Sequence, residues 1–226
     1  MTRIGITGAI GSGKSFVGRV LEARGFRVMD ADRAVHGLYV DNAGLRKKIG
    51  EAFGEDLLIE EPLENGLHFS KIDTRRLADI VFSDEGERRK LESIVYPYLT
   101  EKVRDFLCMS EFGPPLGGVV FLNMSEFRTP HGDVFSEKIF VEAALLTRVP
   151  EIVSMLDEIW IVTAPEDVRE KRLVHRGLSL DDARRRIADQ RGECTPSRFE
   201  GKKVVIIENA GEKSDVERKL DELLNV

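Results

Sequence analysis

The sequence of 226 residues predicts an α/β fold built on a five-stranded parallel sheet with helices on both faces. Three observations predict this fold. Apolar runs near residues 3, 26, 139, 159 and 204 have the length of short buried strands. Segments with helical spacing of apolar residues alternate with these runs. The first strand leads through a glycine-rich turn into a helix, as parallel α/β sheets often do.

Composition and charge indicate one ordinary globular domain over residues 1–226, with 42% hydrophobic and 33% charged residues. A net charge of -6 gives no general attraction for a polyanion, so we expect no nucleic-acid partner. The chain enters a strand within a few residues and has no apolar run of membrane-spanning length. We therefore expect no membrane association and a cytoplasmic location. Cys108 and Cys194 lack metal-ligand spacing and are interpreted as reduced thiols.

The first strand, Ile4 to Thr7, is followed by the strongest motif in the chain. The motif G-x-x-x-x-G-K-[ST] is matched at every fixed position by the stretch Gly8, Ala9, Ile10, Gly11, Ser12, Gly13, Lys14 and Ser15, in which residues 9–12 fill the variable positions. Glycines let phosphate oxygens approach main-chain N–H groups that a Cβ would shield. The helix that follows adds free N–H donors and its positive dipole end. We expect Lys14 to contact the β- and γ-phosphates of a nucleotide and the Ser15 hydroxyl to hold Mg²⁺.

Two carboxylates follow the second strand, which covers Phe26 to Met29. Asp30 and Asp32 lie where ligands bind in doubly wound sheets, at the carboxyl end of a strand. They are candidates for binding magnesium through water and for accepting a proton from an attacking hydroxyl. The alternative is that one of them caps a helix that begins near Arg33.

Residues 41–110 are expected to form a helical block that covers a substrate. Helical periods are predicted for 43–53 and 72–82, with a loop or small hairpin over 55–70 between them. A further helix through Val95 is expected to be broken or restarted at Pro97 and to continue to Leu107. Residues 111–136 contain several Gly and Pro breakers and are expected to be an irregular insertion.

A basic helical hairpin is predicted over 166–199, between the strands at 159–162 and 204–207. Its first helix follows Pro165, and Ser179 with Asp182 forms a capping box that opens the second. The arginines could fold over a bound triphosphate as a lid. Alternatively, they form a solvated face paired with neighbouring acids such as Glu166 and Glu170.

Taken together, the motifs resemble the dephospho-coenzyme A kinase family. The resemblance rests on the phosphate loop, the Asp30-Ala31-Asp32 motif after the second strand, and five later stretches in the same order. The stretches are Asp79-Ile80-Val81-Phe82, Tyr96-Pro97, Glu142-Ala143-Ala144-Leu145-Leu146, Lys171-Arg172 with Arg176, and Asn209-Ala210-Gly211. The resemblance implies a three-layer, nucleoside-kinase-like P-loop fold and ATP-dependent phosphorylation of the ribose 3′-hydroxyl of dephospho-coenzyme A. ATP and Mg²⁺ are the implied cofactors and dephospho-coenzyme A the small-molecule partner.

The resemblance also implies a division of the chain into a core, an acceptor-covering region and a lid. The core would be about residues 1–40, 137–165 and 200–226, the acceptor-covering region about 41–110, the insertion about 111–136 and the lid about 166–199. Asp32 matches the general base, Lys14 the phosphate-stabilising lysine, and Arg172 and Arg176 lid arginines that close on the phosphates. Asn209 matches the loop beside the adenine.

The acceptor side departs from the family pattern at two places. Tyr96 stands where the family usually has His, and Thr74 follows Asp73 where the family usually has Arg. Arg75, at the next position, is the candidate replacement for that arginine, so Asp32, Arg75 and Tyr96 are the expected acceptor-binding residues.

Two other functions stay open on the residues alone. One is another P-loop small-molecule kinase, such as a nucleoside monophosphate kinase. The other is a nucleotide-switch protein that is not a kinase. The chain lacks an Asn-Lys-x-Asp motif, and no predicted strand ends in the aspartate of a Walker-B magnesium site.

Overall fold

A computed structural model describes residues 1–62, 68–112 and 137–225. The expected irregular insertion lies outside these residues, apart from its first two, which belong to a helix. The chain divides into two compact units, the first formed by Met1–Asp30 with Val103–Val226 and the second by Ala31–Lys102. Within the described ranges, no helix has both the length and the apolar character needed to cross a bilayer.

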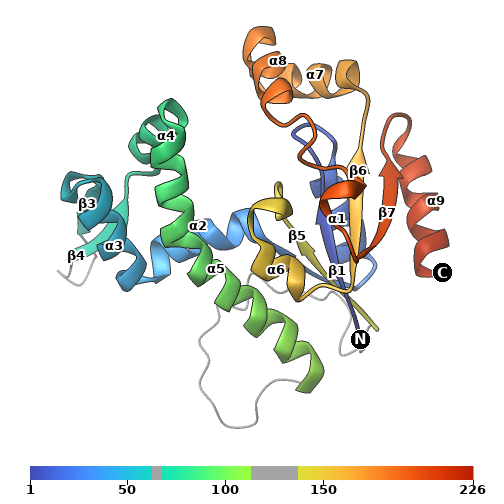
Figure 1. Cartoon of the computed structure of the whole chain (residues 1–226), viewed down its shortest axis with the longest axis horizontal. Helices are drawn as coiled ribbons and strands as arrows, with labels where there is room; N and C mark the ends of the chain where they lie inside the picture. Colours follow the sequence, from blue (N-terminus) through green and yellow to red (C-terminus); the bar gives the residue numbers. More distant parts are fainter. Residues whose placement is uncertain (63–67, 113–136, 226) are drawn as a thin grey trace. The chain divides into compact units, whose positions relative to one another are not determined.

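The first unit contains the predicted five-stranded parallel sheet (Figure 1). Its strands are β1 (Thr2–Thr7), β2 (Arg27–Asp30), β5 (Lys138–Glu142), β6 (Glu158–Thr163) and β7 (Lys203–Glu208). They lie in the order β2-β5-β1-β6-β7. The first strand is central because it pairs in parallel with both β5 and β6. All five strands therefore present their carboxyl ends at one edge of the sheet.

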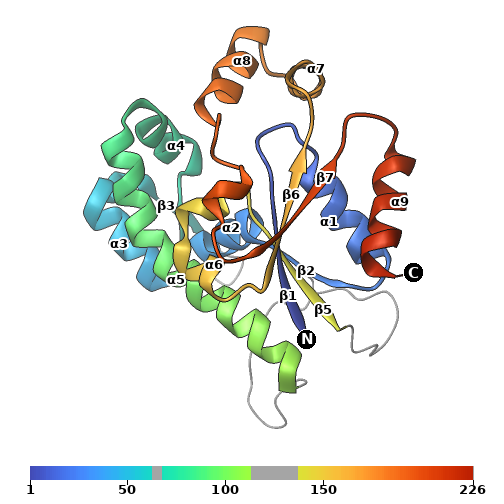
Figure 2. The same ribbon diagram turned by 45° about the vertical axis from the view of Figure 1, so that its right-hand side comes forward.

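Helices α1 (Lys14–Ala23) and α9 (Lys213–Leu224) cover one face of this sheet (Figure 2). Their buried side chains, such as Leu21 and Leu220, form one core with Ile6 and Trp160 of the sheet. On the opposite face the short helix α6 (Pro150–Ser154) and its flanks pack over Gly5. A Cβ on Gly5 would lie 2.6 Å from Leu156 Cδ1, so the glycine permits this close packing.

Two further helices of the first unit, α7 (Glu166–His175) and α8 (Leu180–Asp189), form the predicted basic hairpin. They lie beyond the edge of the sheet that carries the glycine loop (Figures 1 and 2). The predicted capping box is confirmed, because the Asp182 N–H donates to the Ser179 hydroxyl at 3.1 Å. Among its described residues, this unit also has the short helices η3 (Leu146–Arg148) and η4 (Pro196–Arg198).

The second unit is mainly helical. It contains α2 (Ala31–Asp41), α3 (Ala43–Phe53), η1 (Glu55–Leu57) and α4 (Thr74–Ser83). The expected small hairpin is confirmed as an antiparallel pair of β3 (Leu58–Pro62) and β4 (His68–Ile72). Asn42 caps α3, since its side-chain oxygen accepts a hydrogen bond from the Leu45 N–H at 2.8 Å.

The expected break at Pro97 is wrong. One helix, α5 (Glu85–Phe112), runs through the proline and joins the two units. An interior proline costs about 3 kcal/mol because it removes one main-chain hydrogen bond and crowds the preceding turn. Val95 and Leu99 are both buried, on either side of Pro97. Each buried apolar side chain contributes about 1.5–3 kcal/mol, so a continuous apolar stripe offsets the cost of the proline.

Candidate nucleotide-binding site

The glycine loop forms a tight turn between β1 and α1. Gly11 and Gly13 have φ angles of 78° and 95°, a left-handed region that side chains disfavour. The Ser12 N–H donates to the Ala9 carbonyl at 3.0 Å and closes the turn. Gly13 is the N-cap of α1, so Lys14 and Ser15 open the helix at its positive end. This geometry is that of an anion-binding loop.

Glu142 lies directly beside the two loop residues that were expected to act on phosphate and metal. Its Oε1 accepts a hydrogen bond from the Ser15 hydroxyl at 2.7 Å and lies 3.5 Å from Lys14 Nζ. The Glu142 side chain is only 5% exposed. Burial raises the pKa of Glu142, and the nearby Asp30 charge raises it further, while Ser15 and Lys14 act in the opposite direction.

Asp30 and Glu142 end neighbouring strands. The two residues are register partners in the parallel pairing of β2 with β5. Together with the Ser15 hydroxyl they supply an oxygen-rich set of donors at the carboxyl edge of the sheet. Mg²⁺ prefers oxygen ligands and usually keeps several waters, so this donor set suits it chemically. No role for Glu142 was predicted, although the strand expected at 138–141 leads directly into it.

Arg172 and Asn209 bind the main chain of the loop from the side of α7 and β7. Arg172 Nη1 donates to the carbonyls of Gly11 and Ser12 at 3.2 and 3.1 Å. Its Nη2 donates to the main-chain and side-chain oxygens of Asn209 at 2.9 and 3.0 Å. Asn209 Nδ2 in turn donates to the Ser12 carbonyl at 2.8 Å. The two predicted site residues therefore lie together, in contact with the loop.

The Ile10 peptide groups are held by two residues for which sequence reasoning gave no specific role. Arg169 Nε donates to the Ile10 carbonyl at 2.8 Å, and the Ile10 N–H donates to Gln190 Oε1 at 2.7 Å. Arg169 is only 9% exposed, so the interpretation as a solvated face is wrong for this arginine. Both residues belong to the basic hairpin, and nothing local in the sequence shows which of its residues reach the loop.

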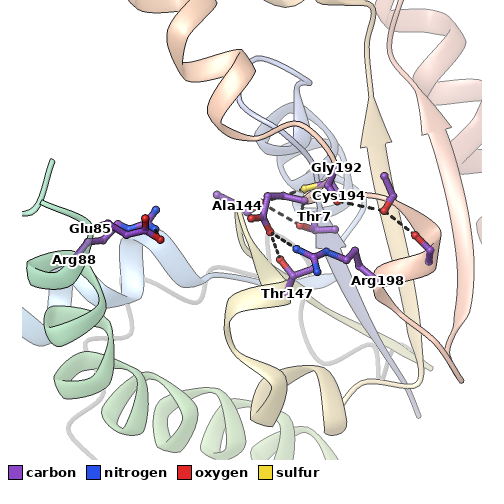
Figure 3. Close-up of polar contacts among 11 residues, drawn as sticks. Thr7, Glu85, Arg88, Ala144, Thr147, Gly192, Cys194 and Arg198 are labelled. Carbon is purple, nitrogen blue, oxygen red and sulfur yellow. Dashed lines mark hydrogen bonds and ion pairs between the residues drawn. The ribbon is translucent and has the colours of Figure 1, made fainter. Parts of the chain in front are cut away.

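The segment that follows α8 contacts the end of β1 (Figure 3). The Cys194 thiol lies 3.8 Å from the Thr7 hydroxyl and 3.7 Å from the Ala144 carbonyl oxygen, and burial raises its pKa. The adjacent Glu193 accepts a hydrogen bond from the Thr147 hydroxyl at 3.1 Å. Cys194 and Cys108 are both free, as expected. These contacts anchor the C-terminal end of the hairpin to the sheet.

The other predicted site residues are Arg176, Asp32, Arg75 and Tyr96. Arg176 is exposed at the C-terminal end of α7. Asp32, Arg75 and Tyr96 belong to the second unit, on α2, α4 and α5. Asp32 lies in the first turn of α2, which begins at Ala31, so of the two aspartates it is Asp30 and not Asp32 that directly precedes the helix. The roles of these residues stay predictions.

A family model and several relatives of known name point to one family. The protein-family model described as "Dephospho-CoA kinase" matches residues 2–111 of this chain. The Dephospho-CoA kinase of Aquifex aeolicus is 31% identical over 82% of this chain and 79% of its own length. That of Geobacter sulfurreducens is 29% identical over 99% and 97%. A solved structure, "Dephospho-CoA kinase from Campylobacter jejuni", shares the fold with a TM-score of 0.61 at 21% identity, over 99% of this chain and 95% of that chain.

Proposed function

The chain belongs to the dephospho-CoA kinase family, and we propose that it phosphorylates the ribose 3′-hydroxyl of dephospho-coenzyme A with ATP. The observation that carries this proposal is the assembled phosphate loop, with Lys14, Ser15 and the buried Glu142 in mutual contact. Phosphoryl transfer requires positioned phosphates and compensation of charge on the transferred group. A helix N-terminus, a lysine and a magnesium ion are suited to both tasks.

The donor side of the proposed reaction lies in the first unit. Lys14 would contact the β- and γ-phosphates, and the loop N–H groups would bind their oxygens. Ser15 and Glu142 would hold Mg²⁺, with Asp30 binding through water. When bound, the ion supplies positive charge to the phosphate oxygens. Arg176, exposed at the end of α7, keeps its proposed role as a lid arginine that closes on the phosphates.

The acceptor side belongs to the second unit. Asp32 is proposed to orient the ribose hydroxyl and to take its proton as the hydroxyl oxygen attacks the γ-phosphorus. Its place in the first turn of α2 is favourable for a carboxylate, because the helix dipole stabilises negative charge there. Arg75 and Tyr96 are proposed to bind other groups of the acceptor. The expected cytoplasmic location stays a prediction.

A coupled assay of ADP release with a panel of acceptors tests this function. We expect turnover with dephospho-coenzyme A and little with AMP, CMP or UMP. Turnover with a nucleoside monophosphate but not with dephospho-coenzyme A would favour the other kinase class. Slow ATP hydrolysis that no acceptor accelerates would instead support a nucleotide-switch protein.

A further inference from the structure

We propose that Arg172 and Asn209 are positioning residues that fix the direction of the phosphate-loop peptide groups, so that Arg172 acts without contacting the transferred phosphoryl group. The proposal rests on the proposed function only in requiring that the loop binds a nucleotide. It assigns Arg172 a different task from the lid arginine that the family resemblance implies.

Arg172 binds four acceptor oxygens of the loop and of Asn209. Its guanidinium donates to the carbonyl oxygens of Gly11 and Ser12 and to the two oxygens of Asn209. All four are acceptors of the protein itself. A guanidinium offers five N–H donors in a fixed plane, so these contacts define the orientation of the whole group.

The Ser12 carbonyl oxygen accepts hydrogen bonds from two side chains. Arg172 Nη1 and Asn209 Nδ2 lie 3.1 and 2.8 Å from the same oxygen. Asn209 is only 5% exposed, and its side-chain oxygen accepts from Arg172 while its amide nitrogen donates to the loop. The two side chains and the Ser12 carbonyl therefore form a closed network in which each residue holds the other two.

The direction of each loop N–H follows from the direction of the carbonyl in the same trans peptide group. The C=O and N–H of one planar trans peptide group point in opposite directions. The structure contains no cis peptide bond among the described residues, so fixing the Ser12 carbonyl toward Arg172 directs the Gly13 N–H away from it. The same reasoning applies to the Ile10 carbonyl, which Arg169 holds, and to the Gly11 N–H. The Gly11 and Gly13 N–H groups thus point away from the arginines, and in our proposal they bind the anion.

Asn209 packs tightly against the loop at Gly13. A Cβ built on Gly13 would overlap Asn209 Nδ2 and lie 3.6 Å from Arg172 Nη1. The side chains therefore lie directly against the outer surface of the loop. A loop held in its binding conformation loses less conformational freedom when a ligand binds, which increases affinity.

Nucleotide binding and steady-state kinetics of four variants test the proposal. These are Arg172→Ala, Arg172→Lys, Asn209→Ala and the double variant Arg172→Ala with Asn209→Ala. The control is Arg185→Ala, an arginine on α8 whose side chain is 71% exposed and pairs with Asp182. Calorimetric titration gives the Kd for ADP and for AMP, which lacks the β-phosphate. Because neither titration needs an acceptor, failure of the proposed kinase activity would not affect this test.

We expect Arg172→Ala and Asn209→Ala each to weaken ADP binding about tenfold, which is the effect of losing about one to two hydrogen bonds. The affinity for AMP should change little. The double variant should bind ADP only slightly more weakly than the weaker-binding single variant does, because both side chains hold the same carbonyl. Arg172→Lys should restore part of the ADP affinity. The control should bind ADP like the wild type.

Three results would overturn the proposal. The first is a fall in kcat for Arg172→Ala with an unchanged Kd for ADP, which would show contact with the transferred group. The second is additive loss in the double variant, which would show that the residues act independently. The third is an equal loss for AMP and ADP. If Arg172→Ala does not fold, the same comparisons are made with Arg172→Lys and Asn209→Ser.

Discussion

The Ser15 hydroxyl donates a hydrogen bond of 2.7 Å to the carboxylate of Glu142, which links the first turn of α1 to the end of β5. The same carboxylate oxygen lies 3.5 Å from Lys14 Nζ. Because Glu142 is buried, both contacts compensate a charge that water reaches poorly. Glu142 therefore links the loop to β5 through a hydrogen bond and an ion pair.

Replacement of Glu142 by Gln should impair magnesium use. A neutral amide binds Mg²⁺ more weakly than a carboxylate does, so kcat should fall about tenfold or more and the magnesium concentration for half-maximal rate should rise. Initial rates measured across a magnesium titration check this. Glu158→Gln is the control, because Glu158 is also buried but lies at the start of β6, where it accepts a hydrogen bond from Trp160 Nε1 at 2.8 Å. Unchanged magnesium dependence in Glu142→Gln would contradict the proposed metal site.

The pH dependence of stability should also differ between the wild type and Glu142→Gln. Burial raises the pKa of Glu142 above its ordinary value of 4.5, so the folded state binds this proton more tightly than the unfolded state does. The stability from this group is fully present below 4.5 and is lost as pH rises through the raised pKa. Glu142→Gln has no ionisable carboxyl group at this position, so its stability does not decrease in this way as pH rises.

Thermal unfolding without nucleotide, from pH 4 to pH 7, measures the effect. We expect Tm of Glu142→Gln relative to wild type to become more favourable as pH rises. A Tm difference that is constant across this range, or that moves the other way, would show that Glu142 does not carry a raised pKa.

Gly13→Ala should abolish tight ADP binding. Alanine at a φ of 95° is strained by about 1–2 kcal/mol, and its Cβ would overlap Asn209 Nδ2. Gly25→Ala is the matched control, because Gly25 has a φ of 84° but no atom within 4 Å of the added Cβ. Both variants should lose stability from backbone strain in thermal unfolding, Gly13→Ala more because of its overlap with Asn209, but only Gly13→Ala should lose ADP affinity in a titration. Equal ADP affinity in the two variants would argue against this loop as the nucleotide site.

Local patterns predicted much of the fold. The five strands, the loop between β1 and α1, the hairpin of β3 with β4 and the capping box at Ser179 follow from composition and spacing within a few residues. The continuity of α5 was not predicted. Pro97 is a local signal for a helix break, whereas the burial of Val95 and Leu99 on either side of it favours one continuous helix. That burial depends on packing, which periodicity around one residue does not reveal.

The candidate site was predictable where its residues are contiguous. Gly8 to Ser15 form one motif, but the contact of Ser15 with Glu142 depends on β5 lying beside β1, and strand order is a property of the whole sheet. The contacts of Arg169 and Gln190 with Ile10 depend similarly on the placement of α7 and α8. Nothing in the sequence distinguishes these two side chains from the exposed polar and charged side chains near them in the hairpin.

Asp32→Asn tests the proposed chemistry on the acceptor side. Asparagine preserves the size of the side chain but cannot take the proton of the attacking hydroxyl, so kcat should fall on the order of 10²-fold or more. The Kd for ADP should stay near the wild-type value, because the proposed nucleotide contacts come from the loop. Asp41→Asn, at the other end of α2, is the control and should keep wild-type turnover. Near-normal turnover of Asp32→Asn would rule out Asp32 as the base. A parallel loss of ADP affinity would instead place its carboxylate in the nucleotide or magnesium site, because a residue that acts only on the acceptor hydroxyl does not affect ADP binding.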